Sequence, residues 1–185
     1  MTTQTRLLTY HDYLNEPESK ERREIVDGEV LMAAAPTLRH RTVSVRILVP
    51  LHLFVSQHGL GYVWHAPVDV VVQQDPVRVR QPDLVFVSNE RADILDDRIN
   101  GGPDLVVEIL SPSNTRNDIE GKLADYANID VQECWLLSPE ARAMEVLRLE
   151  DGEWQRAFIR GAGERLDSVA LPGLELDIAE FFQGT

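Results

Sequence analysis

The sequence predicts a mixed α/β domain, and three observations support this prediction. The chain has 185 residues, of which 43% are hydrophobic and 26% charged, as in an ordinary globular protein. Segments with apolar residues at helical spacing alternate with segments rich in β-branched residues. The stretch 103–110, PDLVVEIL, is apolar on both faces apart from Glu108, as expected for a strand covered on each side. A chain of this length predicts one domain spanning residues 1–185.

The N-terminal part of the chain predicts a short helix followed by a hairpin. Residues 9–23, TYHDYLNEPESKERR, include a short polar helix that we expect to end near Pro17. The next segment, 24–32, reads as two short strands around Asp27 and Gly28. This pair of residues favours a two-residue hairpin turn.

A long helix and two strands are predicted next. Between residues 39 and 58 the apolar side chains recur at helical spacing, and Pro50 is expected to kink or divide this helix. Residues 62–72 and, after a turn at 75–76, residues 77–88 are rich in β-branched side chains, which favour strands.

The rest of the chain completes the mixed order. A loop at 89–102 leads into the strand 103–110. A helix from about Asp118 to Asn128 is expected to follow, because Asn117 and Glu120 have the spacing of a capping box. From residue 39 the predicted order is therefore helix, three strands, helix and strand. The remaining predicted elements are a strand at 133–138, a hairpin at 144–160 and a short terminal helix at 178–182.

Charge and cysteine content narrow the classes of function. A net charge of −13 and a pI near 4.7 argue against a protein that coats nucleic acid by bulk electrostatics. An enzyme could still act on nucleic acid through a local basic cleft and a divalent metal. Cys134 is the only cysteine, so an internal disulfide is impossible. The sequence has no signal-peptide pattern and no apolar run of membrane-spanning length, so we expect a cytoplasmic protein without a membrane partner.

Glu108 is the residue in the apolar strand that most suggests chemistry. Alternation along the strand places it on the same face as Val106 and Leu110. A carboxylate there is costly to bury unless it is paired or binds a metal. Many nucleases carry a lysine two residues after such an acid, but this position is Leu110. A structural ion pair with a buried arginine or lysine is the alternative.

Two acids and one lysine could complete a site with Glu108. Asp104 has the same parity as Glu108, but four residues of strand separate the two by about 13 Å. That is too far for two carboxylates to hold one metal, so Asp83 is favoured over Asp104. Asp83 opens the preceding strand, which could pair alongside; alternatively, it bonds local backbone amides. Lys122 follows Glu108 by 14 residues on a helix that could fold back across the sheet, with Tyr126 one turn further. A solvated surface lysine is the alternative for Lys122.

Six motifs follow one another along the chain: REIVDGEV, APTLRH, RQPDLVFV, VEILSPS, KLADY and ECW. Together they resemble the Uma-two family of restriction-endonuclease-like proteins, within the PD-(D/E)XK nuclease superfamily. The resemblance covers roughly residues 8 to 182. It implies a restriction-endonuclease-like core of α-β-β-β-α-β order, with a central mixed sheet flanked by helices and hairpins at both ends.

The resemblance also implies roles for five residues. Asp83 and Glu108 match the metal-binding acids, and Lys122 matches a lysine that has moved from the strand to the helix. Glu24 matches a hairpin glutamate near the same site, with a solvated strand residue as the alternative. His40 matches the histidine at the start of the long helix, where it could also have no role beyond the helix itself.

These residues would suit a metal-dependent endonuclease that hydrolyses phosphodiester bonds of nucleic acid, expected to be DNA. Mg²⁺ is the expected cofactor and Mn²⁺ a possible substitute, because both favour oxygen ligands. A homodimer is plausible, since two cuts in a duplex suit two sites. Two departures from the family pattern, Asp130 for glycine and Cys134 for tyrosine or histidine, concern packing after the helix rather than the chemistry.

Two other classes of function compete with a nuclease. The main rival is a catalytically inactive relative, in which the fold serves as a binding or oligomerisation module and the polar cluster is a buried salt bridge. The acidic net charge favours this reading. A zinc hydrolase is poorly supported, because the histidines do not form an HExxH-like motif; the histidines considered are His40, His52, His58 and His65.

Overall fold

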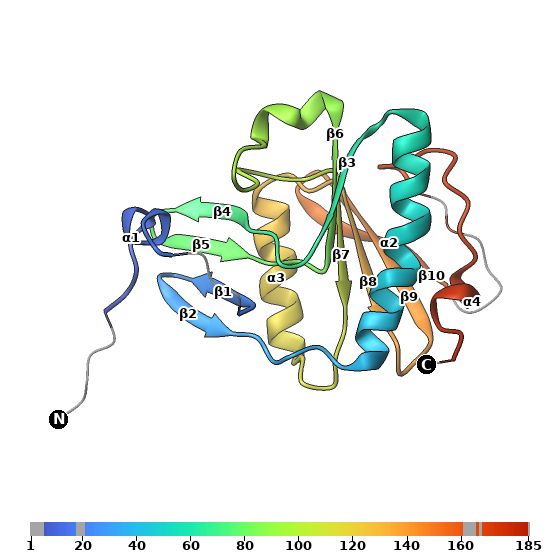
Figure 1. Cartoon of the computed structure of the whole chain (residues 1–185), viewed down its shortest axis with the longest axis horizontal. Coiled ribbons are helices and arrows are strands. Elements are labelled where there is room, and N and C mark those ends of the chain that lie inside the picture. The colour runs from blue at the N-terminus through green and yellow to red at the C-terminus, as the bar shows by residue number, and fades with distance from the viewer. Residues whose placement is uncertain (1–5, 18–20, 161–165, 167, 185) are drawn as a thin grey trace.

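The computed structural model describes residues 6–17, 21–160, 166 and 168–184 and contains two sheets (Figure 1). The six-stranded main sheet comprises β3 (Gly61–His65), β6 (Leu84–Ser88), β7 (Leu105–Ile109), β8 (Glu133–Ser138), β9 (Ala143–Glu150) and β10 (Glu153–Arg160). The four-stranded sheet comprises β1 (Arg23–Val26), β2 (Glu29–Met32), β4 (Val70–Gln74) and β5 (Val77–Arg80). The helices are α1 (Tyr10–Leu14), α2 (Leu38–His58), the 3₁₀ helix η1 (Asn89–Ile94), α3 (Arg116–Asn128) and α4 (Ile178–Phe181).

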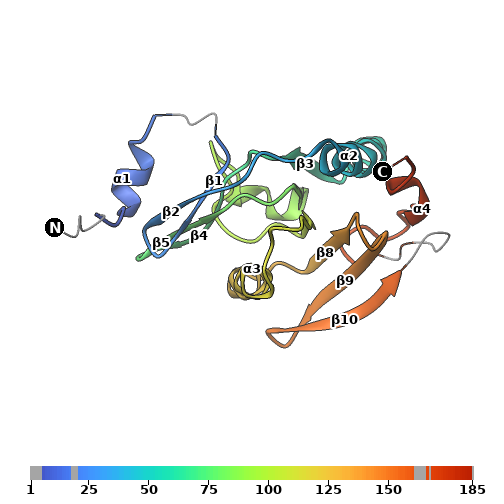
Figure 2. The same ribbon diagram turned by 90° about the horizontal axis from the view of Figure 1, so that it is seen from below.

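Helices cover both faces of the main sheet, as Figure 2 shows for α2 and α3. The face with Leu105, Val107 and Ile109 packs against α2, and the face with Val106 packs against Tyr126 of α3. The strand order is β10-β9-β8-β7-β6-β3, with a parallel β7–β8 pair and antiparallel neighbours elsewhere. The predicted α/β fold is therefore confirmed: α2, β3, β6, β7, α3 and β8 give the expected order of the core. No helix in the described ranges is long and apolar enough to cross a membrane.

Two of the predicted strands were wrong in extent, because each is divided at a proline. The segment 62–72 forms the ends of β3 and β4 on either side of Pro67, and 77–88 forms β5 and β6 on either side of Pro82. Proline has no N–H to donate to a sheet ladder, so it favours such breaks. The β4–β5 hairpin pairs with β1 instead of the main sheet and lies toward the N-terminal side of the molecule (Figure 1). This break places Asp83 directly before β6.

The ends and interiors of the two long helices also differ from expectation. Pro50 does not divide α2, which continues from Leu38 to His58 with a fully buried stripe on both sides of the proline. Helix α3 begins two residues earlier than predicted, because its capping box is Thr115 with Asp118 rather than Asn117 with Glu120. The predicted strand at 133–138, the hairpins and the terminal helix are all observed.

The two departures from the family pattern have structural explanations. Asp130 adopts a left-handed φ of 57° just after α3, where glycine is common. Backbone bonds from Asp130 to Ala127 and from Val131 to Tyr126 form the usual helix-ending motif around it. Cys134 is fully buried in β8 against the α3 side of the sheet. The departure at Asp130 therefore concerns the exposed end of α3, and the departure at Cys134 concerns packing within the sheet.

Candidate active site

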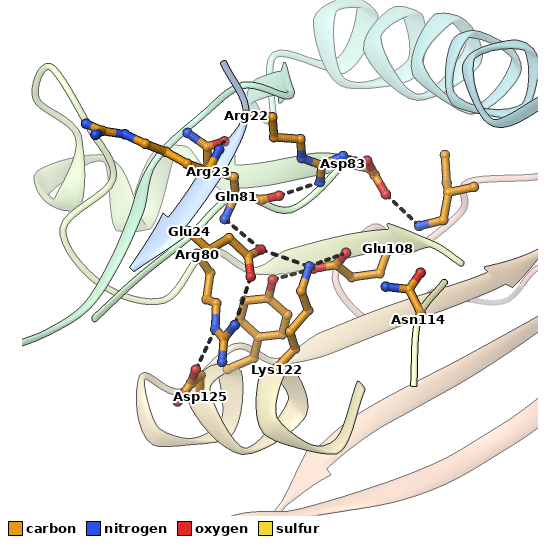
Figure 3. A network of polar contacts seen from close by, with 12 residues as sticks. Arg22, Arg23, Glu24, Arg80, Gln81, Asp83, Glu108, Asn114, Lys122 and Asp125 are labelled. Atoms are coloured by element: carbon orange, nitrogen blue, oxygen red, sulfur yellow. Dashed lines mark hydrogen bonds and ion pairs between the residues drawn. The ribbon is translucent and has the colours of Figure 1, made fainter. Parts of the chain in front are cut away.

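Glu108 lies next to the last residue of β7 and faces α3, with 6% of its surface exposed. The Lys122 amine donates to both of its oxygens, at 3.0 Å each. The Tyr126 hydroxyl donates to the same carboxylate at 2.5 Å. Lys122 and Tyr126 are one turn apart on α3, so a single helix face provides both donors. Figure 3 shows Lys122 reaching from α3 to Glu108.

Glu24 joins this site from the four-stranded sheet. Its carboxylate lies 2.9 Å from the Lys122 amine, so Lys122 bridges Glu24 and Glu108 (Figure 3). The other Glu24 oxygen accepts from Arg80 at 2.8 Å. Arg80 in turn donates to the fully buried Asp125 of α3 at 2.6 Å. Glu24 therefore ties the hairpin β1–β2 to the main sheet and to α3.

Asp83 completes the polar cluster from the strand beside Glu108. The register of β6 and β7 pairs Leu84 with Val107, so continuing it by one residue places Asp83 opposite Glu108. One Asp83 oxygen accepts from Arg22 at 2.6 Å. The other accepts from the backbone N–H of Ile109 at 2.7 Å and lies 3.3 Å from His40 Nε2. This fixes the orientation of a carboxylate that is only 3% exposed.

Asp104, the other acid of the Glu108 strand, lies outside this cluster. Its carboxylate accepts from the backbone N–H of Ser88 at 2.6 Å and lies 3.7 Å from Arg91. The distance argument that favoured Asp83 over Asp104 therefore agrees with the geometry. All five residues expected at the site, namely Glu24, His40, Asp83, Glu108 and Lys122, are in one connected network.

Two carboxylates of the cluster are held in the charged form. Burial alone would raise the pKa of Asp83, but the hydrogen bond from His40 and the charge of Arg22 outweigh it and hold that pKa below its usual value. Burial likewise opposes ionisation of Glu24, and the charges of Lys122 and Arg80 outweigh it, so that its pKa is lowered. Both acids are thus stabilised by cations of the protein itself.

Glu108 behaves in the opposite way. Burial raises the pKa of the Glu108 carboxyl; Lys122 opposes this, while the negative charges of Asp83 and Glu24 add to it. The pKa of Lys122 is raised, because its two carboxylate partners outweigh the effect of burial. Burial, followed by the charge of Glu108, raises the pKa of Tyr126, which therefore stays a hydrogen-bond donor. An additional cation beside Glu108 would favour its charged form.

The lowered pKa values predict a loss of stability in acid. A carboxyl whose pKa is lower in the folded than in the unfolded chain stabilises the fold above its unfolded pKa, near 3.8 for Asp83 and 4.5 for Glu24. This stabilisation is lost as the pH falls through the lower folded pKa. We expect Asp83→Asn to flatten the fall in unfolding free energy below about pH 4, measured by urea titration at several pH values.

The matched control for this prediction is Asp97→Asn, which neutralises an exposed aspartate outside the cluster. Its stability should follow the wild-type pH dependence. Equal acid slopes for Asp83→Asn and wild type would contradict the ionic role of Asp83.

The chemistry of the cluster suits a hard divalent cation, but with competition from the protein. Asp83 and Glu108 offer oxygen ligands from adjacent strands and repel each other, a repulsion that a cation would relieve. Across the described ranges no group of three or more His, Cys, Asp or Glu side chains is arranged for a metal. Mg²⁺ commonly binds through one or two carboxylates, keeping waters and substrate oxygens as its other ligands. Arg22 occupies one Asp83 oxygen, so a metal bound there would compete with it.

Sequence reasoning missed the arginines that surround the acids. Arg80 and Arg78 alternate in the VRVR strand and both donate to Asp125, at 2.6 and 2.5 Å. Two arginines on one face of an apolar strand were the available signal that a buried acid would be needed. Arg22 gave no signal, because it lies among charged residues before β1.

Comparison with models of known protein families shows the family to which this chain belongs. A family model described as "Uma2: Putative restriction endonuclease" matches residues 9–179, which is most of the chain. The chain belongs to the Uma2 family. The resemblance suggested by the Pro-Asp strand, the VEILSPS strand end and the KLADY helix is therefore confirmed. No curated protein matches the sequence.

A solved structure supports the fold of this Uma2 protein. The structure is described as "a putative nuclease belonging to DUF820 from Anabaena variabilis ATCC 29413". It superposes with a TM-score of 0.79, with 18% sequence identity, over 95% of this chain and 97% of that one. At this level of identity the likeness establishes the fold that the sequence predicted.

Proposed function

We propose that the protein is a metal-dependent endonuclease that hydrolyses phosphodiester bonds of nucleic acid. The observation that carries this proposal is the Lys122 amine, held 3.0 Å from Glu108 and 2.9 Å from Glu24, with Asp83 directly before the neighbouring strand β6. An acid–acid–lysine set of this kind suits phosphodiester hydrolysis, the reaction implied by the description of the family as a putative restriction endonuclease.

Each residue of the set has a distinct task. Asp83 and Glu108 would hold Mg²⁺, with Mn²⁺ as a substitute. The bound cation would supply Lewis-acid polarisation of the phosphate and a lowered pKa for a water molecule. Lys122 carries a fixed positive charge and would orient the attacking water or stabilise the charge that grows on the phosphate oxygens.

The surrounding residues position these groups. Tyr126 donates to one Glu108 oxygen and so fixes the rotation of that carboxylate. Glu24 on β1 contacts the Lys122 amine, which extends from α3, and so helps to hold it in place. His40 lies 3.3 Å from Asp83 and orients its second oxygen together with the Ile109 amide. We assign Glu24 and His40 to positioning, because their contacts are with other members of the site.

Cleavage assays with matched acid variants test the proposal. Purified wild-type protein, Asp83→Asn and Asp104→Asn would be incubated with a panel of labelled DNA and RNA in Mg²⁺, Mn²⁺ or EDTA. We expect Asp83→Asn to lower the cleavage rate by at least about 100-fold, because metal chemistry supplies several kcal/mol of the barrier reduction. Asp104→Asn removes a neighbouring buried carboxylate outside the cluster and should keep most of the activity.

Two results would contradict the proposal. Cleavage that survives Asp83→Asn would place the chemistry elsewhere or in a contaminant. A wild-type protein that cuts no member of the panel in either metal would favour the second candidate function, a binding or oligomerisation module.

The second candidate rests on one observation, which is that every acid of the cluster already has a cationic partner. Arg22 neutralises Asp83, and Lys122 neutralises Glu24 and Glu108. A buried salt-bridge network of this kind can fix a fold without catalysis. Metal binding that displaces Arg22 separates the two candidates, because a purely structural network gains nothing from a divalent cation.

Finer properties of the proposed nuclease stay predictions. We expect a cytoplasmic protein that acts on DNA in preference to RNA. A homodimer is a further prediction, which sedimentation of the purified chain would test.

A further inference from the structure

A pocket of about 670 Å³ opens directly onto Asp83. It lies between the segment that joins β2 to α2 and the first half of α2. Arg22, His40 and Asp83 form its polar wall. Pockets of about 300–1,000 Å³ are typical of sites that enclose a small molecule or a single chemical unit of a polymer. We call this space the Asp83 pocket.

The other side of the cluster offers no comparable room. The space lined by Glu108, Lys122 and Tyr126 measures about 10 Å³, which accommodates about one water molecule. The larger Asp83 pocket is therefore the route by which we expect a substrate phosphate to reach Asp83. The attacking water, by contrast, fits the small space beside Lys122.

Two acids, Glu21 and Asp83, and two arginines line the Asp83 pocket, in a chain whose net charge is −13. Arg22 and Arg41 both contribute to its wall. The Arg41 guanidinium is exposed and makes no ion pair or hydrogen bond within the described part of the chain. Guanidinium groups bind phosphate oxygens in a two-pronged geometry. Arg41 is therefore available for a phosphate next to the one at Asp83.

Much of the remaining lining is apolar. This apolar part includes residues 33–36, which are three alanines and a proline, with Val45, Leu48 and Pro67. Such a wall suits the flat face of a nucleobase together with its sugar. A base that is stacked in a duplex reaches such a wall only after unstacking, which costs a few kcal/mol, whereas a base in a single strand is already free.

We propose that the Asp83 pocket binds one unpaired nucleotide of a single-stranded nucleic acid. Arg41 holds a phosphate beside the scissile one, and residues 33–36 contact the base and sugar. This inference rests on the proposed function for the position of the scissile phosphate at Asp83. It narrows the substrate class to single strands or locally unpaired regions.

Binding measurements on the full chain in EDTA test the inference without cleavage. Fluorescence anisotropy would compare a labelled oligodeoxynucleotide, the same strand annealed to its complement, and the oligoribonucleotide of the same sequence. We expect the single strand to bind at least about tenfold more tightly than the duplex, because the duplex must first unstack a base. Comparing the affinities of the oligodeoxynucleotide and the oligoribonucleotide shows whether the sugar affects binding.

Two variants with matched controls locate the binding. Ala34→Trp fills the pocket from an exposed loop position and should weaken single-strand binding by at least about tenfold. Its control is Ala157→Trp, at an exposed position on β10, which should leave single-strand binding unchanged. Arg41→Ala should weaken binding. It should also reduce the slope of the logarithm of affinity against the logarithm of salt concentration by about one, as expected for the loss of one phosphate contact. Arg156→Ala makes the same charge change on β10 and serves as its control.

Equal binding of duplex and single strand, unchanged binding in Ala34→Trp, or no binding of any oligonucleotide would overturn the inference. Because these assays contain no metal, they separate it from the proposed catalysis. Single-strand binding that is lost in Ala34→Trp would stand even if the protein cut nothing.

Discussion

Replacing Lys122 by alanine is expected to lower the rate of metal-dependent cleavage by about 100- to 1,000-fold, the usual effect of removing one group that stabilises transition-state charge. Lys122 is the only one of the proposed catalytic residues that can offer positive charge to the phosphate. Its amine is already held between Glu24 and Glu108, so little reorganisation is needed when charge develops. Single-turnover cleavage at saturating metal would measure the loss.

The same substitution is also expected to destabilise the fold. It would leave Glu24 without its lysine partner and Glu108 with only Tyr126, and breaking a buried ion pair from one side costs about 3–5 kcal/mol. Lys122→Arg keeps the positive charge and should retain most of the stability. Its planar guanidinium cannot take the place of the compact amine, so cleavage should recover only in part.

A charge control is available on the same helix. Arg116→Ala removes an exposed positive charge at the start of α3 and should change neither stability nor cleavage by much. Folded Lys122→Ala protein that cuts at the wild-type rate would show that Lys122 is structural only.

Asp125→Ala is also expected to cost about 3–5 kcal/mol of stability, because it removes a fully buried acceptor and leaves Arg80 with Glu24 alone and Arg78 with Asp27 alone. Asp125 is fully buried and accepts from both Arg78 and Arg80. Arg80 would retain only Glu24, so the disturbance should also reach the site. Urea unfolding of the variant and wild type at neutral pH measures the difference.

Asp118→Ala on the same helix provides the comparison for Asp125→Ala. Asp118 belongs to the exposed capping box with Thr115, and the loss of such a cap costs about 1 kcal/mol. If Asp125→Ala is no more destabilising than Asp118→Ala, the arginine pair does not depend on Asp125. A double variant, Asp125→Ala with Arg80→Met, should recover part of the loss, since it also removes the buried Arg80 charge that Asp125→Ala leaves with Glu24 alone.

The sequence was sufficient for the parts of the site that depend on local periodicity. Strand alternation placed Glu108 on the face opposite Val107, and that face meets α3. Helical spacing placed Lys122 and Tyr126 on one face of α3, where both contact Glu108. Extended-strand geometry separated Asp104 from Glu108. Each of these inferences needed only the regular dimensions of a single element.

Long-range ion pairs were beyond such reasoning. Arg22 meets Asp83 across 61 residues of sequence, and Arg80 meets Asp125 across 45. These contacts depend on the small sheet, which exists because Pro67 and Pro82 divide strands that look continuous. Both prolines were visible in the sequence, but nothing local showed that β4 and β5 would pair with β1.

Locating Mn²⁺ in crystals of the full chain tests the central claim most directly. Mn²⁺ scatters anomalously and substitutes for Mg²⁺ at oxygen ligands. The account predicts one strong peak within bonding distance of Asp83 and Glu108, with Arg22 moved away from the Asp83 oxygen that it now occupies. Crystals soaked in Mn²⁺ that show no peak there, with Arg22 still paired to Asp83, would contradict a metal-dependent nuclease.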